Sequence, residues 1–190
     1  PDVYQGAEDR LLTLVDPDNR QPVDFQRAAI RLEKLNDHLR QEGHAAVARR
    51  LAAQPAAGAA KLFVTPSLLT LPGRTSALGP KGRYEAIPCA GALSDHICAY
   101  ARMSGDSSLL TIAVRWFARL TGGEMRPPLG SEVWQDTRLE WATTGIGSCF
   151  EDVFTRRRLS AREVRGLWVL ELGQVLTDFP LAVLERTPTG

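Results

Sequence analysis

The spacing of hydrophobic residues changes near residue 73 of this 190-residue chain. Before that point apolar side chains recur every three or four positions, which is the period of one face of an α-helix. From residue 84 onward they tend to recur at every second position, which is the period of a β-strand, and turn-forming residues separate the runs. The sequence therefore predicts a helical first part and an all-β remainder, a fold of the α+β class.

Three helices are expected in the first part. The clearest covers residues 25–40, where one face is apolar: Phe25, Ala28, Ala29, Leu32, Leu35 and Leu39. Asp24 precedes this run and has a side chain suited to capping a helix N-terminus. We expect a second, Ala-rich helix over residues 45–53. A third is expected over residues 59–64, which Pro66 separates from a further turn.

Seven strands are expected in the second part. They are predicted at residues 84–87, 97–102, 109–116, 137–141, 149–154, 167–172 and 181–185. The sequence Ser104-Gly105-Asp106-Ser107 suits a hairpin loop between two of these strands. Short strands with turns between them are typical of an antiparallel β-sandwich.

The composition argues against several classes of protein. With 44% hydrophobic and 24% charged residues, the chain resembles an ordinary globular protein. Its formal net charge of +1 gives no reason to expect nucleic acid or an anionic membrane as a partner. No apolar run approaches the roughly 20 residues that span a bilayer. Since three scattered cysteines are too few for a disulfide framework and no leader precedes them, we expect reduced thiols and a cytoplasmic location.

We expect neither a metal site nor a cofactor. The three histidines have no ligand spacing and no supporting cysteine pair: His38, His44 and His96. Asp16 and Asp18 fit the start of a calcium-binding loop, but Arg20 stands where a later ligand should be. The chain therefore lacks the usual sequence patterns of a structural or catalytic metal.

Several other residues admit both a structural and a functional interpretation. The four tryptophans could stack on sugars, but aromatic residues in strand patterns more often belong to the core: Trp116, Trp134, Trp141 and Trp168. We expect Cys98 to be buried as a small apolar residue within a strand. We expect Arg156-Arg157-Arg158 to be a solvated turn.

The first 25 residues resemble a known family. Residues 1–8, Pro-Asp-Val-Tyr-Gln-Gly-Ala-Glu, are similar to the segment that closes the eighth barrel strand of α-amylase-family enzymes. Residues 14–25, Leu-Val-Asp-Pro-Asp-Asn-Arg-Gln-Pro-Val-Asp-Phe, follow in an order that resembles the maltooligosyl trehalose synthases, which belong to glycoside hydrolase family 13. Downstream, Trp134-Gln135-Asp136-Thr137 resembles one of the family's closing motifs. The chain departs from the family pattern at Ala7, Asp9 and Gln21.

The resemblance implies a division of the chain at residue 73. Residues 1–73 would be the end of a catalytic (β/α)8 barrel, with the end of strand eight, a substrate loop and the following helices. Residues 74–190 would be a C-terminal antiparallel β-sandwich domain. Because the sequence starts at Pro1 rather than at Met, we expect it to be cut from a longer protein whose N-terminal catalytic barrel is its partner.

The resemblance also implies a reaction. Such enzymes convert the reducing-end α-1,4 bond of a maltooligosaccharide into an α,α-1,1 bond by retaining intramolecular transglycosylation, an isomerase reaction of trehalose biosynthesis. Retaining chemistry needs two carboxyl groups about 5–5.5 Å apart. In this family those groups lie on earlier barrel strands. We therefore expect no catalytic residue in this chain and no activity of the chain alone.

Six residues are candidate ligands of the maltooligosaccharide substrate: Tyr4, Gln5, Glu8, Asp18, Asn19 and Arg20. The first three would follow barrel strand eight directly, where barrel enzymes build their active sites. The other three offer acceptors and a forked donor for sugar hydroxyls, although the same loop could be purely structural. Two alternatives stay open: a non-catalytic α-glucan-binding or scaffolding module, and another α-amylase-family transglycosylase.

Overall fold

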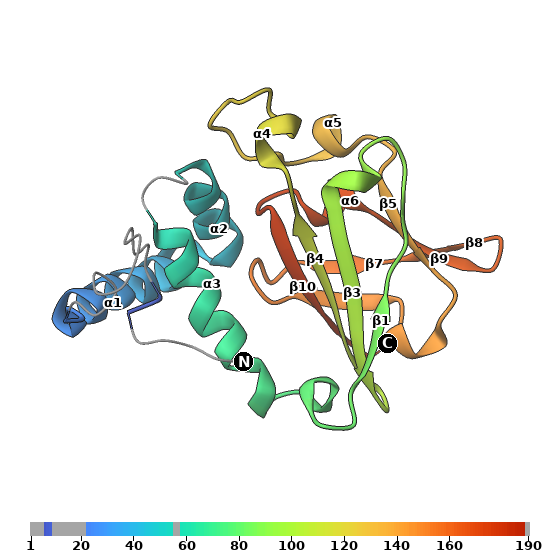
Figure 1. Ribbon diagram of the computed structural model, residues 1–190. Helices are drawn as coiled ribbons and strands as arrows, with labels where there is room; N and C mark the ends of the chain where they lie inside the picture. Colours follow the sequence, from blue (N-terminus) through green and yellow to red (C-terminus); the bar gives the residue numbers. More distant parts are fainter. Residues whose placement is uncertain (1–5, 9–21, 55–57, 189–190) are drawn as a thin grey trace.

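The computed structural model describes residues 6–8, 22–54 and 58–188. Three helices, α1 (Phe25–Glu42), α2 (His44–Ala53) and α3 (Ala59–Leu69), form a layer beside a β-sandwich (Figure 1). The predicted combination of an α-helical part with antiparallel sheets is confirmed. The predicted boundary at residue 73 falls between two short 3-10 helices, η3 (Leu71–Gly73) and η4 (Ser76–Leu78), that connect α3 to the first strand.

The ends of α1 follow from local sequence. The Asp24 carboxylate accepts a hydrogen bond from the backbone N–H of Arg27 at 2.9 Å, so the predicted N-cap is confirmed. Gly43 ends the helix with φ of 81°, a conformation that glycine adopts without steric cost. The chain can therefore reverse direction between α1 and α2 within a single residue.

Helix α3 corrects one prediction, because Pro66 lies inside it and does not interrupt it. The hydroxyl of Thr65 donates to the Lys61 carbonyl at 3.0 Å. The hydroxyl of Ser67 donates to the Phe63 carbonyl at 2.8 Å. These bonds flank the position where proline lacks an N–H donor, and burial of Phe63 holds the helix against the sheet.

The sandwich contains all seven predicted strands, and each end lies within two residues of its predicted position. The strands are β1 (Arg83–Ala86), β2 (Cys89–Ala90), β3 (Ile97–Ser104), β4 (Ser107–Val114), β5 (Arg138–Trp141), β6 (Cys149–Asp152), β7 (Arg158–Ser160), β8 (Arg162–Val164), β9 (Leu167–Glu171) and β10 (Leu181–Arg186). The sequence did not predict the two- and three-residue strands β2, β7 and β8. The predicted hairpin is confirmed, since Ser104 pairs with Ser107 across its turn.

The strands form two antiparallel sheets. One has the order β1-β3-β4-β10-β6-β7, and the other has the order β2-β5-β9-β8. Short helices fill the connections: η5 (Ser94–His96), α4 (Phe117–Leu120), α5 (Ser131–Trp134), η6 (Thr144–Ile146) and α6 (Leu172–Val175). Figure 1 shows α4 and α5 at one end of the sandwich.

The six-stranded sheet is covered on both faces, and β10 shows how. Ala182 and Leu184 belong to the core between the two sheets. Leu181 and Val183 alternate with them and pack against the core beneath the helices. Successive side chains of a strand point to opposite faces, so an apolar run such as this one fits a strand buried on both sides.

The tryptophans divide into two groups. Trp134 and Trp141 are buried in the sandwich core, and Trp168 packs against it, as expected. Trp116 is 47% exposed, so the expectation of a core position is wrong for this residue. The predicted strand included Trp116, but β4 ends at Val114 and the backbone of Trp116 turns to φ of 58°. Cys98 is also exposed rather than buried, because it lies on the outer face of β3.

Candidate functional site

Most of the predicted substrate ligands lie outside the described residues. These are Tyr4, Gln5, Asp18, Asn19 and Arg20. Glu8 is described and half-buried, in a turn over residues 6–8. A Cβ atom added to Gly6 would lie 2.8 Å from Val23, so this turn packs closely against the residues that precede α1. The structure thus brings Glu8 near the start of the first helix, and the role of all six residues stays a prediction.

The most buried carboxylates of the described part serve the fold. Asp152 accepts hydrogen bonds from the backbone N–H groups of Phe154 at 3.3 Å, Thr155 at 3.1 Å and Val183 at 3.3 Å. Burial raises the pKa of this carboxyl above its usual range, and the hydrogen bonds oppose that effect. These hydrogen bonds show that Asp152 stabilises the turn between β6 and β7.

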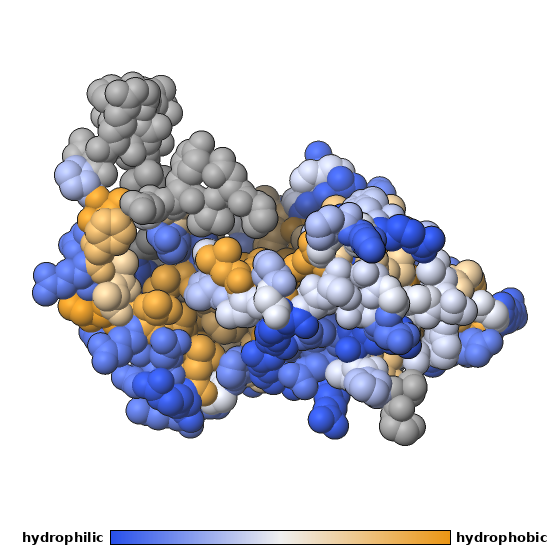
Figure 2. All heavy atoms as spheres, turned by 90° about the horizontal axis from the view of Figure 1, so that it is seen from below, coloured by the Kyte–Doolittle hydropathy of each residue, from blue (hydrophilic) through white to orange (hydrophobic). Residues whose placement is uncertain are grey.

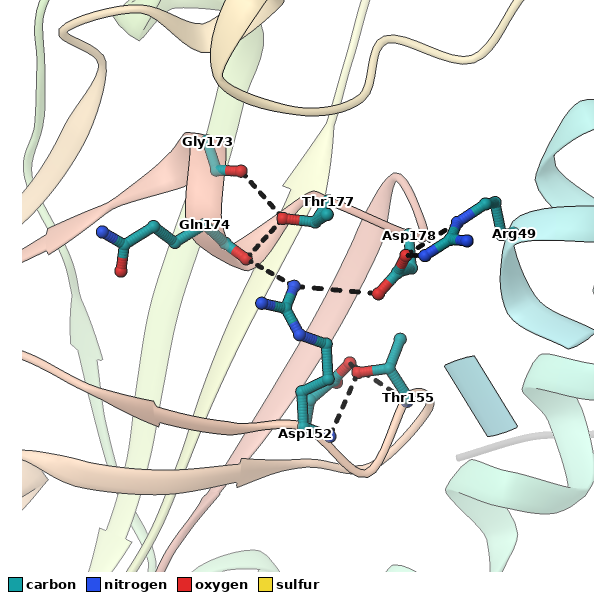
Figure 3. Close-up of polar contacts among 8 residues, drawn as sticks. Arg49, Asp152, Thr155, Gly173, Gln174, Thr177 and Asp178 are labelled. Atoms are coloured by element: carbon teal, nitrogen blue, oxygen red, sulfur yellow. Dashed lines mark hydrogen bonds and ion pairs between the residues drawn. The ribbon is translucent and has the colours of Figure 1, made fainter. Parts of the chain in front are cut away.

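A second buried carboxylate joins the helical layer to the sandwich (Figure 3). Asp178 lies before β10, and its side chain is 3% exposed. Arg49 of α2 reaches it with two guanidinium nitrogens, of which Nε lies 2.9 Å from Oδ1. On the other side, Nη1 of Arg157 lies 3.7 Å from Oδ2 and donates to the Gln174 carbonyl at 3.0 Å. We call Arg49, Asp178 and Arg157 the interlayer clamp.

The clamp revises one expectation. Arg157 was expected in a solvated turn, but it pairs with a buried acid because the β6–β7 turn lies beside the segment that leads into β10. Arg49 and Asp178 are 129 positions apart, so no local pattern could have paired them. The clamp fixes the position of α2 relative to the sheet, and it offers no site for catalysis.

His44 is the first residue of α2 and lies near the turn between β6 and β7. Burial lowers the pKa of His44 below its usual 6.5, and the Arg156 guanidinium lowers it further, while Glu151 acts in the opposite direction. A neutral imidazole therefore suits this contact between α2 and the sandwich better than a charged one.

The helical layer leaves a large apolar surface uncovered. Of the eighteen residues of α1, only Leu35 is buried. Phe25 and Ile30 of α1 and Leu69 of α3 are 60%, 47% and 52% exposed, and we call them the helical apolar surface. Figure 2 shows apolar side chains gathered over the helices, whereas the sandwich presents a mostly polar surface from this side. Exposed apolar patches of this kind mark interaction sites in soluble proteins.

One hollow lies on the outer side of the four-stranded sheet. It has a volume of about 450 Å³ and runs over β5, β8 and β9. Arg138 pairs with Glu140, and Arg162 pairs with Glu171, each at 2.7 Å. Because these charges neutralise one another, the hollow has no excess of either sign to attract an ion.

In the part of the chain that the structure describes, no group of three or more His, Cys, Asp and Glu side chains could hold a metal ion. None of the helices in residues 22–54 and 58–188 is both long and apolar enough to cross a bilayer.

Comparison with known proteins confirms the resemblance seen in the sequence. No protein-family profile matches the chain. Two curated proteins, both named "Putative maltooligosyl trehalose synthase" and from two strains of Mycobacterium tuberculosis, are 33% identical to this chain over 148 residues. The match covers 76% of this chain, which spans 16% of the length of those relatives.

The chain also has a weaker likeness to a solved structure. The crystal structure of a noncanonic maltogenic α-amylase from Thermotoga neapolitana aligns with a TM-score of 0.41 and 11% identity. The alignment covers 65% of this chain and 24% of the amylase.

Proposed function

We propose that this chain is the C-terminal part of a maltooligosyl trehalose synthase. The observation that carries the proposal is the 33% identity over 148 residues to proteins of that name. The first 25 residues, whose resemblance to the family is most specific, also support it. The parent enzyme would act on maltooligosaccharides in the cytoplasm.

In this proposal the chain divides near residue 73. Residues 1–73 would complete the catalytic (β/α)8 barrel, and residues 74–190 would be the C-terminal sandwich. The helical apolar surface supports this division, since a helix that packs on one side only against its own chain has its other side available for a barrel. The shared core and the interlayer clamp would then hold the end of the barrel against the sandwich.

The parent reaction would be the conversion of a terminal α-1,4 bond to an α,α-1,1 bond with retention. The nucleophile and the general acid would come from the barrel that precedes Pro1, so the parent would be a (1→4)-α-D-glucan 1-α-D-glucosylmutase and this chain would contribute no catalytic group. Tyr4, Gln5 and Glu8 would line the end of strand eight. The loop with Asp18, Asn19 and Arg20 would close the cleft around the sugar and limit the entry of water, which competes with the released glucose.

The proposed loop directly precedes α1 in the sequence, and the N-terminus of α1 is fixed by the Asp24 cap. Helix α1 contacts α2, and α2 is tied to the sandwich through Arg49 and Asp178. A helix held in this way would give a substrate loop a fixed point of attachment.

The test compares the product of the complete gene with the 190-residue chain. Each is incubated with maltopentaose, and the anomeric region of the NMR spectrum is followed for the α,α-1,1 linkage. We expect turnover by the complete protein and none by the chain alone. Trehalose-forming turnover by the chain alone, or a complete gene product that begins at Pro1, would overturn the proposal.

A further inference from the structure

Trp116 stands out because its backbone and its exposure are both unusual. It follows β4 directly and has φ of 58° and ψ of 47°, the left-handed region that bulky residues rarely occupy. Its side chain nevertheless remains about half exposed, so burial does not compensate for the strain. Backbone strain of this kind persists where the surroundings impose it, and such positions cluster at functional sites.

The neighbours of Trp116 hold its ring in place. The guanidinium carbons of Arg115 and Arg119 lie 4.2 Å and 5.0 Å from the ring centroid. The imidazole of His96 meets the ring edge-on, with centroids 5.9 Å apart. Nε of Arg115 donates to the Asp95 carbonyl at 2.7 Å, so the arginine is anchored as well. The indole is therefore presented at the surface in a fixed orientation.

A hollow of about 440 Å³, lined by residues of α4 and α5, adjoins this group. Leu93, Leu120 and Val133 provide its apolar lining. Arg119, Arg126 and Glu132 provide polar groups, and His96 connects the hollow to Trp116. We call this hollow together with Trp116 the Trp116 site.

The Trp116 site carries charges of both signs. Arg119, Arg126 and Glu132 line the hollow, and Arg115 lies over the Trp116 ring. Arg126 pairs with Glu124 at 2.6 Å. Glu132 and Arg119 form no ion pair with any residue that the structure describes, so both could bind a ligand. The Glu132 carboxylate would repel a phosphate in this hollow, whereas a neutral ligand would find both a hydrogen-bond acceptor and a donor there.

The remaining chemistry matches a sugar. A pyranose ring has an apolar C–H face, which stacks on an indole, and hydroxyl groups, which bind a carboxylate and a forked guanidinium at once. We propose that the Trp116 site binds a neutral oligosaccharide, and specifically an α-1,4-linked glucan. The choice of linkage rests on the proposed function, whereas the choice of a neutral sugar rests on the site itself.

The proposal is tested by calorimetric titration of the complete 190-residue chain with maltoheptaose. Trp116→Gly removes the ring and relaxes the left-handed residue, so the fold should be retained, and thermal melting verifies this. We expect the dissociation constant to rise at least about tenfold in this variant. Tyr84→Ala is the matched control, because Tyr84 is 62% exposed and stacks on Tyr100 at a different place on the sheet. It should bind as the unmodified chain does.

A second measurement uses the fluorescence of the chain itself. Trp116 is the most exposed of the four tryptophans, so iodide should quench it preferentially, and maltoheptaose should protect it. Arg119→Ala keeps the indole and should weaken binding by a smaller factor. Equal affinity for maltoheptaose in the Trp116→Gly and Tyr84→Ala variants would overturn the proposal, since the sugar would then bind elsewhere.

Cellohexaose separates this inference from the proposed function. If cellohexaose binds through Trp116 and maltoheptaose does not, the Trp116 site stands as a sugar site and the α-glucan assignment falls. If neither sugar binds, the Trp116 site is refuted, and the proposed function is still judged by the turnover of the complete gene product. Binding of maltoheptaose alone supports both.

Discussion

The two faces of the six-stranded sheet are buried in different ways. The inner face packs against a second sheet in a core that is closed on all sides by strands and short helices, with Trp134 and Phe150 almost fully buried. The outer face packs against α2 and α3, and the largest buried side chain that these helices contribute is Phe63. The helices beyond it keep apolar side chains in contact with solvent. The core between the two sheets is thus fully covered, whereas the helical layer buries one side and leaves apolar side chains on the other side exposed.

Removal of a side chain from the closed core should have the largest effect. Trp134 is fully buried, and its Nε1 donates to the Pro128 carbonyl at 2.9 Å. We expect Trp134→Ala to lower the free energy of unfolding by about 3–5 kcal/mol, because a large cavity forms and an acceptor loses its donor. Urea denaturation followed by circular dichroism measures this. A loss below about 1 kcal/mol would mean that the sandwich core is not the main source of stability.

Release of the interlayer clamp should have a smaller and more local effect. Arg49→Met keeps the length of the side chain but leaves the buried Asp178 with Arg157 alone. We expect a loss of about 1–3 kcal/mol, concentrated in the helices. Hydrogen exchange should therefore accelerate in α1 to α3 and change little in the sheets.

The control for the clamp is Arg40→Met, which removes an exposed ion pair with Asp37 on α1. Exposed pairs contribute little, and we expect less than about 0.5 kcal/mol. If the two variants lose the same stability, or if exchange accelerates equally in the sheets, the clamp does not hold the layers together.

The pH should act on the helical layer through His44. Because burial lowers its folded pKa below the usual 6.5, the unfolded chain binds more protons between the two values. The stabilising contribution of the neutral histidine is therefore complete above 6.5 and is lost as the pH falls through that window. The urea midpoint should fall more steeply from about pH 8 to about pH 5.5 in the unmodified chain than in His44→Gln. Equal slopes would contradict the assignment.

The same contrast explains how much could be predicted from the sequence. Strands of the closed core carry dense apolar patterns, and Leu181 to Glu185 was therefore recognised as a strand. Strands β7 and β8 have three residues each and carry charged side chains, so only their pairing with β6 and β9 makes them strands. Pro66 shows the converse, since tertiary packing continues a helix that the local pattern would end.

The candidate site was less accessible to local patterns. The clamp joins residues 129 positions apart, and spacing cannot reveal such a pair. Trp116 continued an apolar run and looked like a strand residue, and only its backbone conformation shows that it leaves the sheet. The substrate ligands expected from the family resemblance lie outside the described residues except for Glu8, so they remain predictions.

Replacement of the exposed apolar residues should change stability least and solution behaviour most. In the double variant Phe25→Gln, Ile30→Gln, both residues are already in water, so we expect the free energy of unfolding to change by less than about 1 kcal/mol. If the helical layer is half of an interface, the unmodified chain should self-associate or bind a hydrophobic dye, and the double variant should do neither.

The matched control for that variant is Leu167→Gln, which removes an exposed leucine from β9 of the sandwich. It should leave dye binding and self-association unchanged, because the sandwich buries its own core. A monodisperse, dye-silent unmodified chain would show that α1 needs no further partner. The two sides of the sheet would then differ only in how densely they are packed. The case for a barrel that packs against these helices would rest on sequence identity alone.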